Sequence, residues 1–94
     1  MESAPSHIGG MQVVLWSPLD DRHQTTGKNR HLVAARQVHS PSGLAICSEA
    51  AESFFLFLCD AAWRPIADTW HESLDAARAQ AEFEFTNLSS SWVG

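Results

Sequence analysis

The stretch Asp68-Thr69-Trp70-His71-Glu72-Ser73 brings an imidazole close to two carboxyl groups. Asp, His and Glu are side chains that bind metal ions and that transfer protons in acid–base catalysis. His71 is the central candidate, because an imidazole titrates near neutral pH. One hypothesis is therefore a small enzyme that uses His71 together with Asp68 or Glu72.

The elements expected around this stretch do not favour such a site. Residues 66–71, IADTWH, read as a strand, on which Asp68 and His71 point to opposite faces. Ser73 is a suitable N-cap for a helix over 74–85. On that helix, Glu82 and Glu84 lie about 200° apart around the axis, which is poor geometry for paired carboxylates. The pattern favours a solvated strand-to-helix connection, and no catalytic residue is predicted.

Other chemical motifs are absent from the sequence. The five histidines form no H-x-x-x-H, H-E-x-x-H or H-x-H pair, so no metal site is expected. The chain has no G-x-S-x-G elbow and no phosphate-binding glycine loop, and we expect no cofactor. Cys47 and Cys59 lie in apolar runs and read as small buried hydrophobes.

Composition narrows the class of protein further. The 94 residues are 45% hydrophobic and 18% charged, which is typical of one small globular domain. A net charge of −5 without a Lys/Arg cluster argues against nucleic-acid binding. Neither a membrane span nor a signal peptide is recognisable, so the cytoplasm is the expected location. An acidic surface would suit an immunity-type or antitoxin-like inhibitor of a basic enzyme.

The order of elements predicts an α+β domain over residues 11–94, preceded by a flexible leader over 1–10. Met11 opens MQVVLW and is itself an alternative start. We expect an antiparallel sheet of three to five strands with one C-terminal helix packed on one face. The expected strands are 11–16, 31–39, 44–48, 53–60 and 66–71, and the polar stretch 17–30 reads as a loop.

The helix and the central hairpin can be specified in more detail. Leu74, Ala77, Ala81 and Phe85 recur on one helical face, while Arg78 and Glu82 form an outward i,i+4 pair. If residues 49–52 are the hairpin loop, Ser48 opposes Ser53. Ile46 then opposes Phe55, Leu44 opposes Phe57, Cys47 opposes Phe54 and Ala45 opposes Leu56. A slip of one residue would exchange the two faces.

The strand over 53–59 is apolar on both faces, whatever its register. A single helix covers only one face of a sheet, so the other face needs cover from MQVVLW, from Ser91-Trp92-Val93 or from a partner. We therefore expect a protein-interaction module or homo-oligomer without catalytic activity. The candidate contact residues are Phe54, Leu56, Trp63, Trp70 and His71. The tryptophans could instead close the rim of a small core.

Residues 59–85, CDAAWRPIADTWHESLDAARAQAEFEF, resemble a pattern in small bacterial proteins of unassigned function. That pattern is C-D-x-x-W, then D-T-W-H-x-[ST]-L-x-x-A-x-x-Q-A-E-[FY]-E-[FY]. The resemblance covers under a third of the chain. It implies a compact β-rich domain with one helix, and it brings no activity and no catalytic residue.

Overall fold

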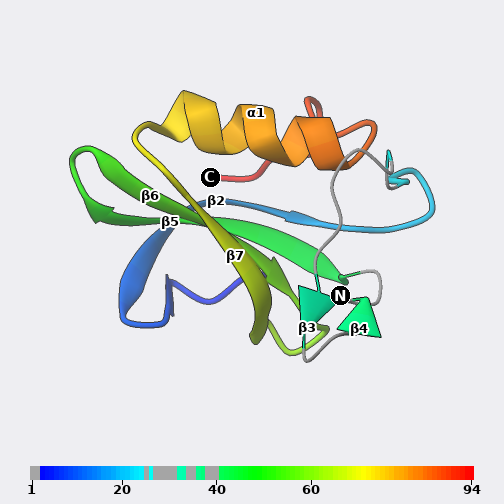
Figure 1. Cartoon of the computed structure of the whole chain (residues 1–94), viewed down its shortest axis with the longest axis horizontal. Helices are drawn as coiled ribbons and strands as arrows, with labels where there is room; N and C mark the ends of the chain where they lie inside the picture. The colour runs from blue at the N-terminus through cyan, green and yellow to red at the C-terminus, as the bar shows by residue number, and fades with distance from the viewer. Residues whose placement is uncertain (1–2, 25, 27–31, 34–35, 38–40) are drawn as a thin grey trace.

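The computed structural model describes residues 3–24, 26, 32–33, 36–37 and 41–94. They form an antiparallel five-stranded sheet with a C-terminal helix on one side (Figure 1), which confirms the predicted α+β architecture. The strand order is β1-β2-β5-β6-β7. The strands are β1 (His7–Ile8), β2 (Met11–Pro18), β5 (Gly43–Ala50), β6 (Ser53–Cys59) and β7 (Pro65–His71).

Helix α1 (Leu74–Glu84) begins where the sequence predicts. The Ser73 hydroxyl accepts a hydrogen bond from the Ala76 backbone amide at 3.0 Å, and Asp75 lies in the first turn. Ala77 and Ala81 are fully buried against the sheet. Their small side chains allow the helix to lie close to Leu44, Ile46, Leu56 and Leu58, with Phe85 completing this first core. In the described part of the chain, no helix is long and apolar enough to cross a membrane.

The predicted register of the central hairpin is wrong by one residue. Cys47 lies opposite Phe55 and Ile46 opposite Leu56, because a bulge between Ser48 and Ala50 adds one residue to β5. The slip exchanges the two faces. The helix therefore covers Leu56 and its neighbours, and Phe55, Phe57 and Cys59 face the other way.

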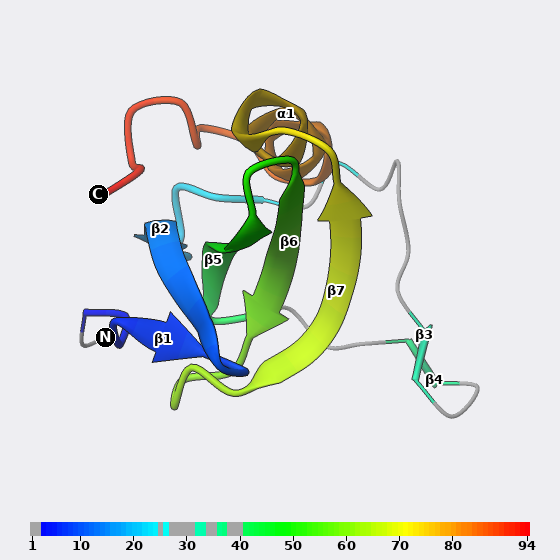
Figure 2. The same ribbon diagram turned by 90° about the vertical axis from the view of Figure 1, so that its left-hand side faces the viewer.

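That other face is covered by the chain itself. Figure 2 shows β1 and the turn between β6 and β7 on the side of the sheet opposite to α1. A second core forms there from Ile8, Ala45, Cys47, Phe57, Cys59 and Trp63. Trp16 contacts Trp63 edge to face, with ring centroids 5.7 Å apart. His7 and Ile8 come from the segment expected to be a leader, and Ile8 is only 5% exposed.

A tight turn directs Trp63 into the second core. The Asp60 carboxylate accepts hydrogen bonds from the backbone amides of Ala62 and Arg64, each at 2.9 Å. These bonds, chiefly that from Arg64, lower the pKa of Asp60. Trp63 itself has a φ of 60°, which costs a non-glycine residue about 1 kcal/mol. Burial of the indole offsets that strain.

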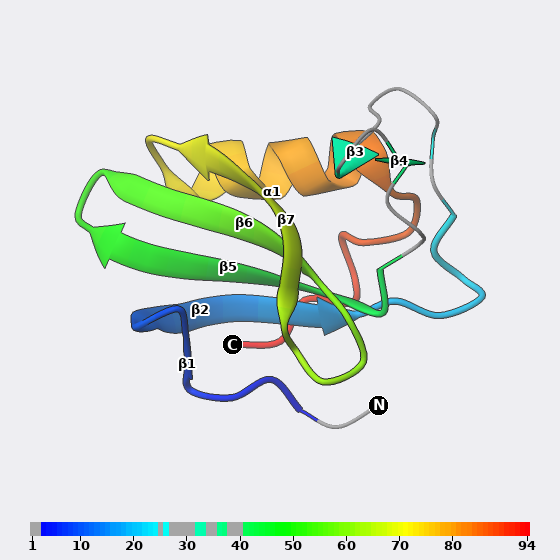
Figure 3. The ribbon, with the colours of Figure 1, turned by 60° about the horizontal axis from the view of Figure 1, so that its bottom comes forward.

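The C-terminal segment is attached to β2 by backbone hydrogen bonds. Trp16 and Val93 exchange backbone hydrogen bonds of 3.0 and 2.8 Å, so the C-terminal segment runs beside β2 (Figure 3). The strand predicted over 31–39 lies partly outside the described residues. The described ones form a separate two-stranded sheet of β3 (Leu32–Val33) and β4 (Arg36–Gln37).

The burial of Ile8 yields a stability prediction. Ile8→Ala should lower the free energy of unfolding by about 2 kcal/mol, because it removes buried methyl groups and leaves a cavity in the second core. Urea denaturation measures the change. Val93→Ala is the control, since Val93 is 44% exposed, and it should cost less than about 0.5 kcal/mol. Equal, small effects of both changes would show that β1 does not support the core.

Candidate functional site

The most exposed large hydrophobic side chain among the described residues is Trp70, at 55%. It lies near the end of β7 and pairs with Phe55 of β6. Its indole Nε1 donates a hydrogen bond to the Ser53 hydroxyl at 2.9 Å. The ring is thus fixed to the neighbouring strand while more than half of its surface meets water. A fixed, amphipathic ring of this kind is suited to contact a partner.

A shallow hollow of about 390 Å³ lies beside this indole. Its lining consists of Glu52, Trp70, Glu72 and Ser73. In the described part of the chain, neither glutamate forms an ion pair or a side-chain hydrogen bond. The hollow therefore combines an aromatic surface with two uncompensated negative charges.

The outer edge of β7 is the longer of the two sheet edges. At the opposite edge, β1 has two residues, whereas β7 has seven and pairs only with β6 among the described strands. Such an edge presents backbone N–H and C=O groups to whatever lies beside it. The end near Pro65 is irregular, because the register shifts between Leu58 and Cys59 of β6, opposite the extra residue Ile66 of β7. From Ala67 to His71 the ladder is regular.

The Asp68 and His71 side chains of β7 point to opposite faces of the sheet, as predicted. His71 lies opposite Phe54 and Asp68 opposite Phe57, so the two side chains project from opposite faces of the sheet. His71 Nε2 is 2.7 Å from the Thr69 hydroxyl. Burial lowers the pKa of His71, and the negative charge of Glu84 opposes part of that shift. Glu72 lines the hollow beside Trp70, and His71 is not among the residues that line it.

The other predicted contact residues lie deeper in the molecule. Leu56 is fully buried under α1, and Phe54 packs at the margin of the same core. Trp63 is 7% exposed in the second core. Of the five candidates, only Trp70 presents a large apolar surface to water, and His71 is half-buried on the opposite face of the sheet.

A second polar cluster joins residues that are 68 positions apart. His23 Nε2 lies 3.1 Å from the Ser91 hydroxyl, and His23 Nδ1 lies 3.4 Å from a carboxylate oxygen of Asp20. The order Asp, His, Ser is that of a hydrolase triad. Sequence patterns could not reveal it, because Ser91 reaches His23 only through the path of the C-terminal segment.

The hydrogen bonds around His23 favour the opposite tautomer from the one that a catalytic base needs. The Asp20 backbone amide, which can only donate, lies 3.2 Å from Nδ1, so Nδ1 accepts and Nε2 carries the proton. Nε2 then donates to Ser91, Ser91 to Ser17, and Ser17 to the Pro18 carbonyl. A base that activates a serine needs an unprotonated nitrogen toward the hydroxyl. This network is a structural clamp.

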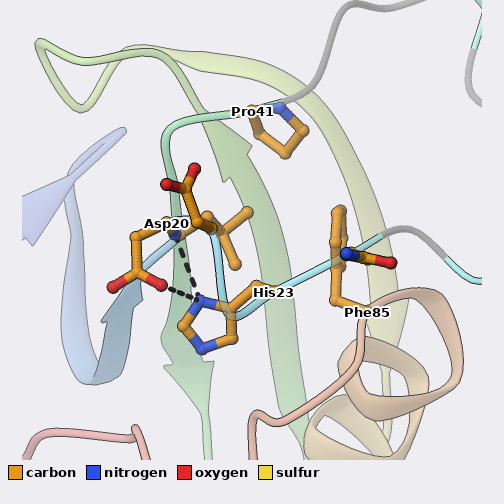
Figure 4. Close-up of a pocket in the computed structure, with 7 residues that line it drawn as sticks. Asp20, His23, Pro41 and Phe85 are labelled. Atoms are coloured by element: carbon orange, nitrogen blue, oxygen red, sulfur yellow. Dashed lines mark hydrogen bonds and ion pairs between the residues drawn. The ribbon is translucent and has the colours of Figure 1, made fainter.

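The adjoining hollow, of about 630 Å³, supports the same interpretation (Figure 4). Asp20 and His23 line one side of the hollow and contact each other, while Pro41 and Phe85 line its other sides. The Asp20 carboxylate is bound at both oxygens by Arg22, at 3.1 Å each, and this contact lowers its pKa. Ser91 does not line the hollow. Among the described residues, no group of three His, Cys, Asp or Glu side chains could hold a metal ion.

The loop that carries His23 also covers the end of α1. The Gln24 amide and the Thr86 hydroxyl are 3.0 Å apart, and the Thr26 amide donates to the Glu84 carbonyl at 2.8 Å. The Thr26 hydroxyl also donates to the Phe83 carbonyl at 2.6 Å. The last carbonyls of a helix lack partners within the helix, and this loop supplies partners for two of them. The clamp and these bonds together hold residues 20–24 and Thr26 on the domain.

The cysteines are both free and buried. Burial raises the pKa of Cys47 to about 11 and that of Cys59 to about 12. A thiol reacts through its thiolate, which is scarce at neutral pH when the pKa is that high. Both side chains serve as small apolar groups in the second core.

Comparison with models of protein families, with curated proteins and with solved structures finds no match to this chain. The resemblance of residues 59–85 to small bacterial proteins of unassigned function therefore stays a prediction.

The clamp is testable through Ser91. Ser91→Ala leaves His23 Nε2 and the fully buried Ser17 hydroxyl without this partner, which should cost about 1–3 kcal/mol of unfolding free energy. Ser90→Ala, at the exposed neighbouring position, should cost less than about 0.5 kcal/mol. Chemical denaturation compares the two. A nitrogen-detected NMR spectrum that shows a proton on His23 Nδ1 would refute the assigned tautomer.

His71 yields a prediction about pH. Its pKa in the folded protein lies below its value in the unfolded chain, about 6.5, so protons bind preferentially to the unfolded chain. Lowering the pH through about 6.5 should therefore destabilise the fold through this residue. Proton NMR should give a titration midpoint for His71 below about 6.5, and His71→Gln should lose less stability than the parent protein between about pH 7 and 5. A midpoint above that value would contradict the burial argument.

Proposed function

We propose that this protein is a non-catalytic protein-interaction module whose contact surface is the outer edge of β7 together with Trp70. The observation that carries the proposal is a regular strand edge that no further described strand pairs with and that ends in a fixed and largely exposed indole. Strand edges bind other chains through backbone hydrogen bonds, and tryptophan is among the residues that contribute most to interface affinity. The partner is a second copy of the chain or a different protein.

The lack of a convergent reactive group in the described residues supports a role without catalysis. His71 and Asp68 lie on opposite faces, His23 donates to the serine that it would have to activate, and the two thiols have raised pKa values. The proposal also places the protein in the cytoplasm. Two free cysteines in its core support that location, because disulfides persist mainly in oxidising compartments.

A second candidate function is an immunity-type or antitoxin-like inhibitor of a basic enzyme. The specific observation in its favour is the charge beside Trp70, where Glu52, Asp68 and Glu72 are all exposed. Complementary charge accelerates the association of an acidic inhibitor with a basic target. This candidate uses the same surface and differs only in what binds there.

Photo-crosslinking tests the contact surface even while the partner is unidentified. A benzophenone amino acid placed at Trp70 should give a discrete crosslinked product in cells that make the protein, because β7 would lie against the partner. The same group placed at Phe83 is the control, since Phe83 is an exposed aromatic residue on α1. Sedimentation velocity then shows whether the product contains a second copy. Equal crosslinking at both positions, or none at Trp70, would contradict the proposal.

A further inference from the structure

We infer that the edge of β7 binds an extended, positively charged segment of a partner protein. The segment would add a strand to the sheet and place one Lys or Arg side chain in the hollow beside Trp70. This inference rests on the proposed function and specifies the chemistry of the partner. Three independent features support it: the backbone edge, the surrounding charge and the indole.

The backbone edge determines the conformation of the segment. Within the described residues, the hydrogen bonds of β7 go to β6, so one side of the strand offers its donors and acceptors outward. Its regular part, Ala67 to His71, contains no proline and no bulge. A chain that satisfies such groups must itself be extended, as in strand addition. Because these hydrogen bonds join backbone groups, they do not require a particular amino-acid sequence in the partner segment.

The charge around the edge determines the sign of the partner. Asp68, Glu72 and Glu52 are exposed, and Asp75 is exposed in the first turn of α1. Arg64, at the start of β7, is held by Asp60 at 3.0 Å. Among the described residues, these four carboxylates therefore give this end of β7 a negative charge, and the whole chain carries −5.

This charge disfavours a second copy of the chain as the partner. A copy paired with β7 would bring the same acidic side chains to the same edge, and like charges across a strand pair are destabilising. A basic segment instead neutralises them.

The indole and its hollow determine where one cation would sit. Indole is the aromatic ring that binds cations best, and nearby carboxylates add Coulomb attraction. The hydrogen bond to Ser53 fixes the ring, so less side-chain entropy is lost on binding. The N-terminus of α1 adds a partial positive charge of about half a unit near Ser73. The full charges of Glu52 and Glu72 outweigh it.

The test uses labelled seven-residue peptides, the length of β7, with the full chain as receptor. One peptide alternates Lys with Val and its match alternates Glu with Val. In fluorescence anisotropy the Lys peptide should bind at least about tenfold more tightly, and its affinity should fall as salt is raised. A Lys peptide with N-methyl groups on alternate amides cannot pair with the edge and should bind at least about tenfold more weakly.

Protein variants locate the binding. Trp70→Ala should weaken the Lys peptide about five- to tenfold, and the double change Glu52→Gln and Glu72→Gln should weaken it and reduce its salt dependence. Phe83→Ala, which removes an exposed aromatic side chain from α1, should leave binding unchanged. Because Trp70 is exposed and the glutamines are isosteric, circular dichroism should show that all variants remain folded.

The opposing outcomes separate this inference from the proposed function. Equal binding of the Lys and Glu peptides, or binding that ignores N-methylation or Trp70→Ala, would overturn the inference. If crosslinks still form at Trp70, the edge remains an interaction surface for a partner of other chemistry. Self-association that Trp70→Ala abolishes would identify a second copy as the occupant and would also overturn the inference. Loss of both crosslinks and peptide binding would remove the proposed function itself.

Discussion

The structure depends on a central hairpin whose two faces are both buried. Leu44 and Ile46 face α1, whereas the alternating residues Ala45 and Cys47 face the opposite side. All four side chains are fully buried. A sheet that is buried on both faces needs a covering layer on each. Among the described residues, one helix of 11 residues supplies the first layer. The second layer must therefore come from the sheet and its connections.

Curling of the sheet supplies that second layer. The short strand β1 and the tight turn after β6 lie across the face opposite to α1, and they carry Ile8 and Trp63 into one core. Trp16 closes this core from β2. As a result, no partner is needed to cover the aromatic face of β6. The proposed contact with a partner is therefore at the edge of the sheet, near Trp70, and not on its face.

Local patterns predicted the elements because local chemistry forms them. Helix α1 begins at the predicted Ser73 cap, and its buried alanines recur at the predicted helical spacing. The divergence of Asp68 and His71 followed from strand alternation alone and is confirmed. In contrast, the hairpin register depended on one bulged residue near Glu49, and nothing in the composition of that loop distinguishes a bulge from a longer turn. One residue was enough to exchange the faces.

The polar cluster around His23 and the role of Ile8 could not be predicted, because both depend on contacts between residues that are distant in the sequence. His23 meets Ser91 only after β2 and the C-terminal segment have docked, and neither residue lies in a recognisable motif. Its tautomer is inferred from a single backbone amide, that of Asp20. Ile8 likewise gains its role only when the sheet curls. Composition correctly marks these residues as polar or apolar, but it does not identify their partners.

The structural roles of the other polar groups support the proposal that the edge of β7 binds a partner. Asp20 and His23 are used in the clamp, Asp60 shapes the turn that directs Trp63, and Ser73 caps the helix. A group that already satisfies a structural partner loses that bond if it binds a ligand, and a buried one incurs a desolvation cost as well. Glu52, Asp68 and Glu72 carry no such obligation within the described residues. They surround the one large aromatic side chain that the sheet leaves in water, so binding there costs the fold least.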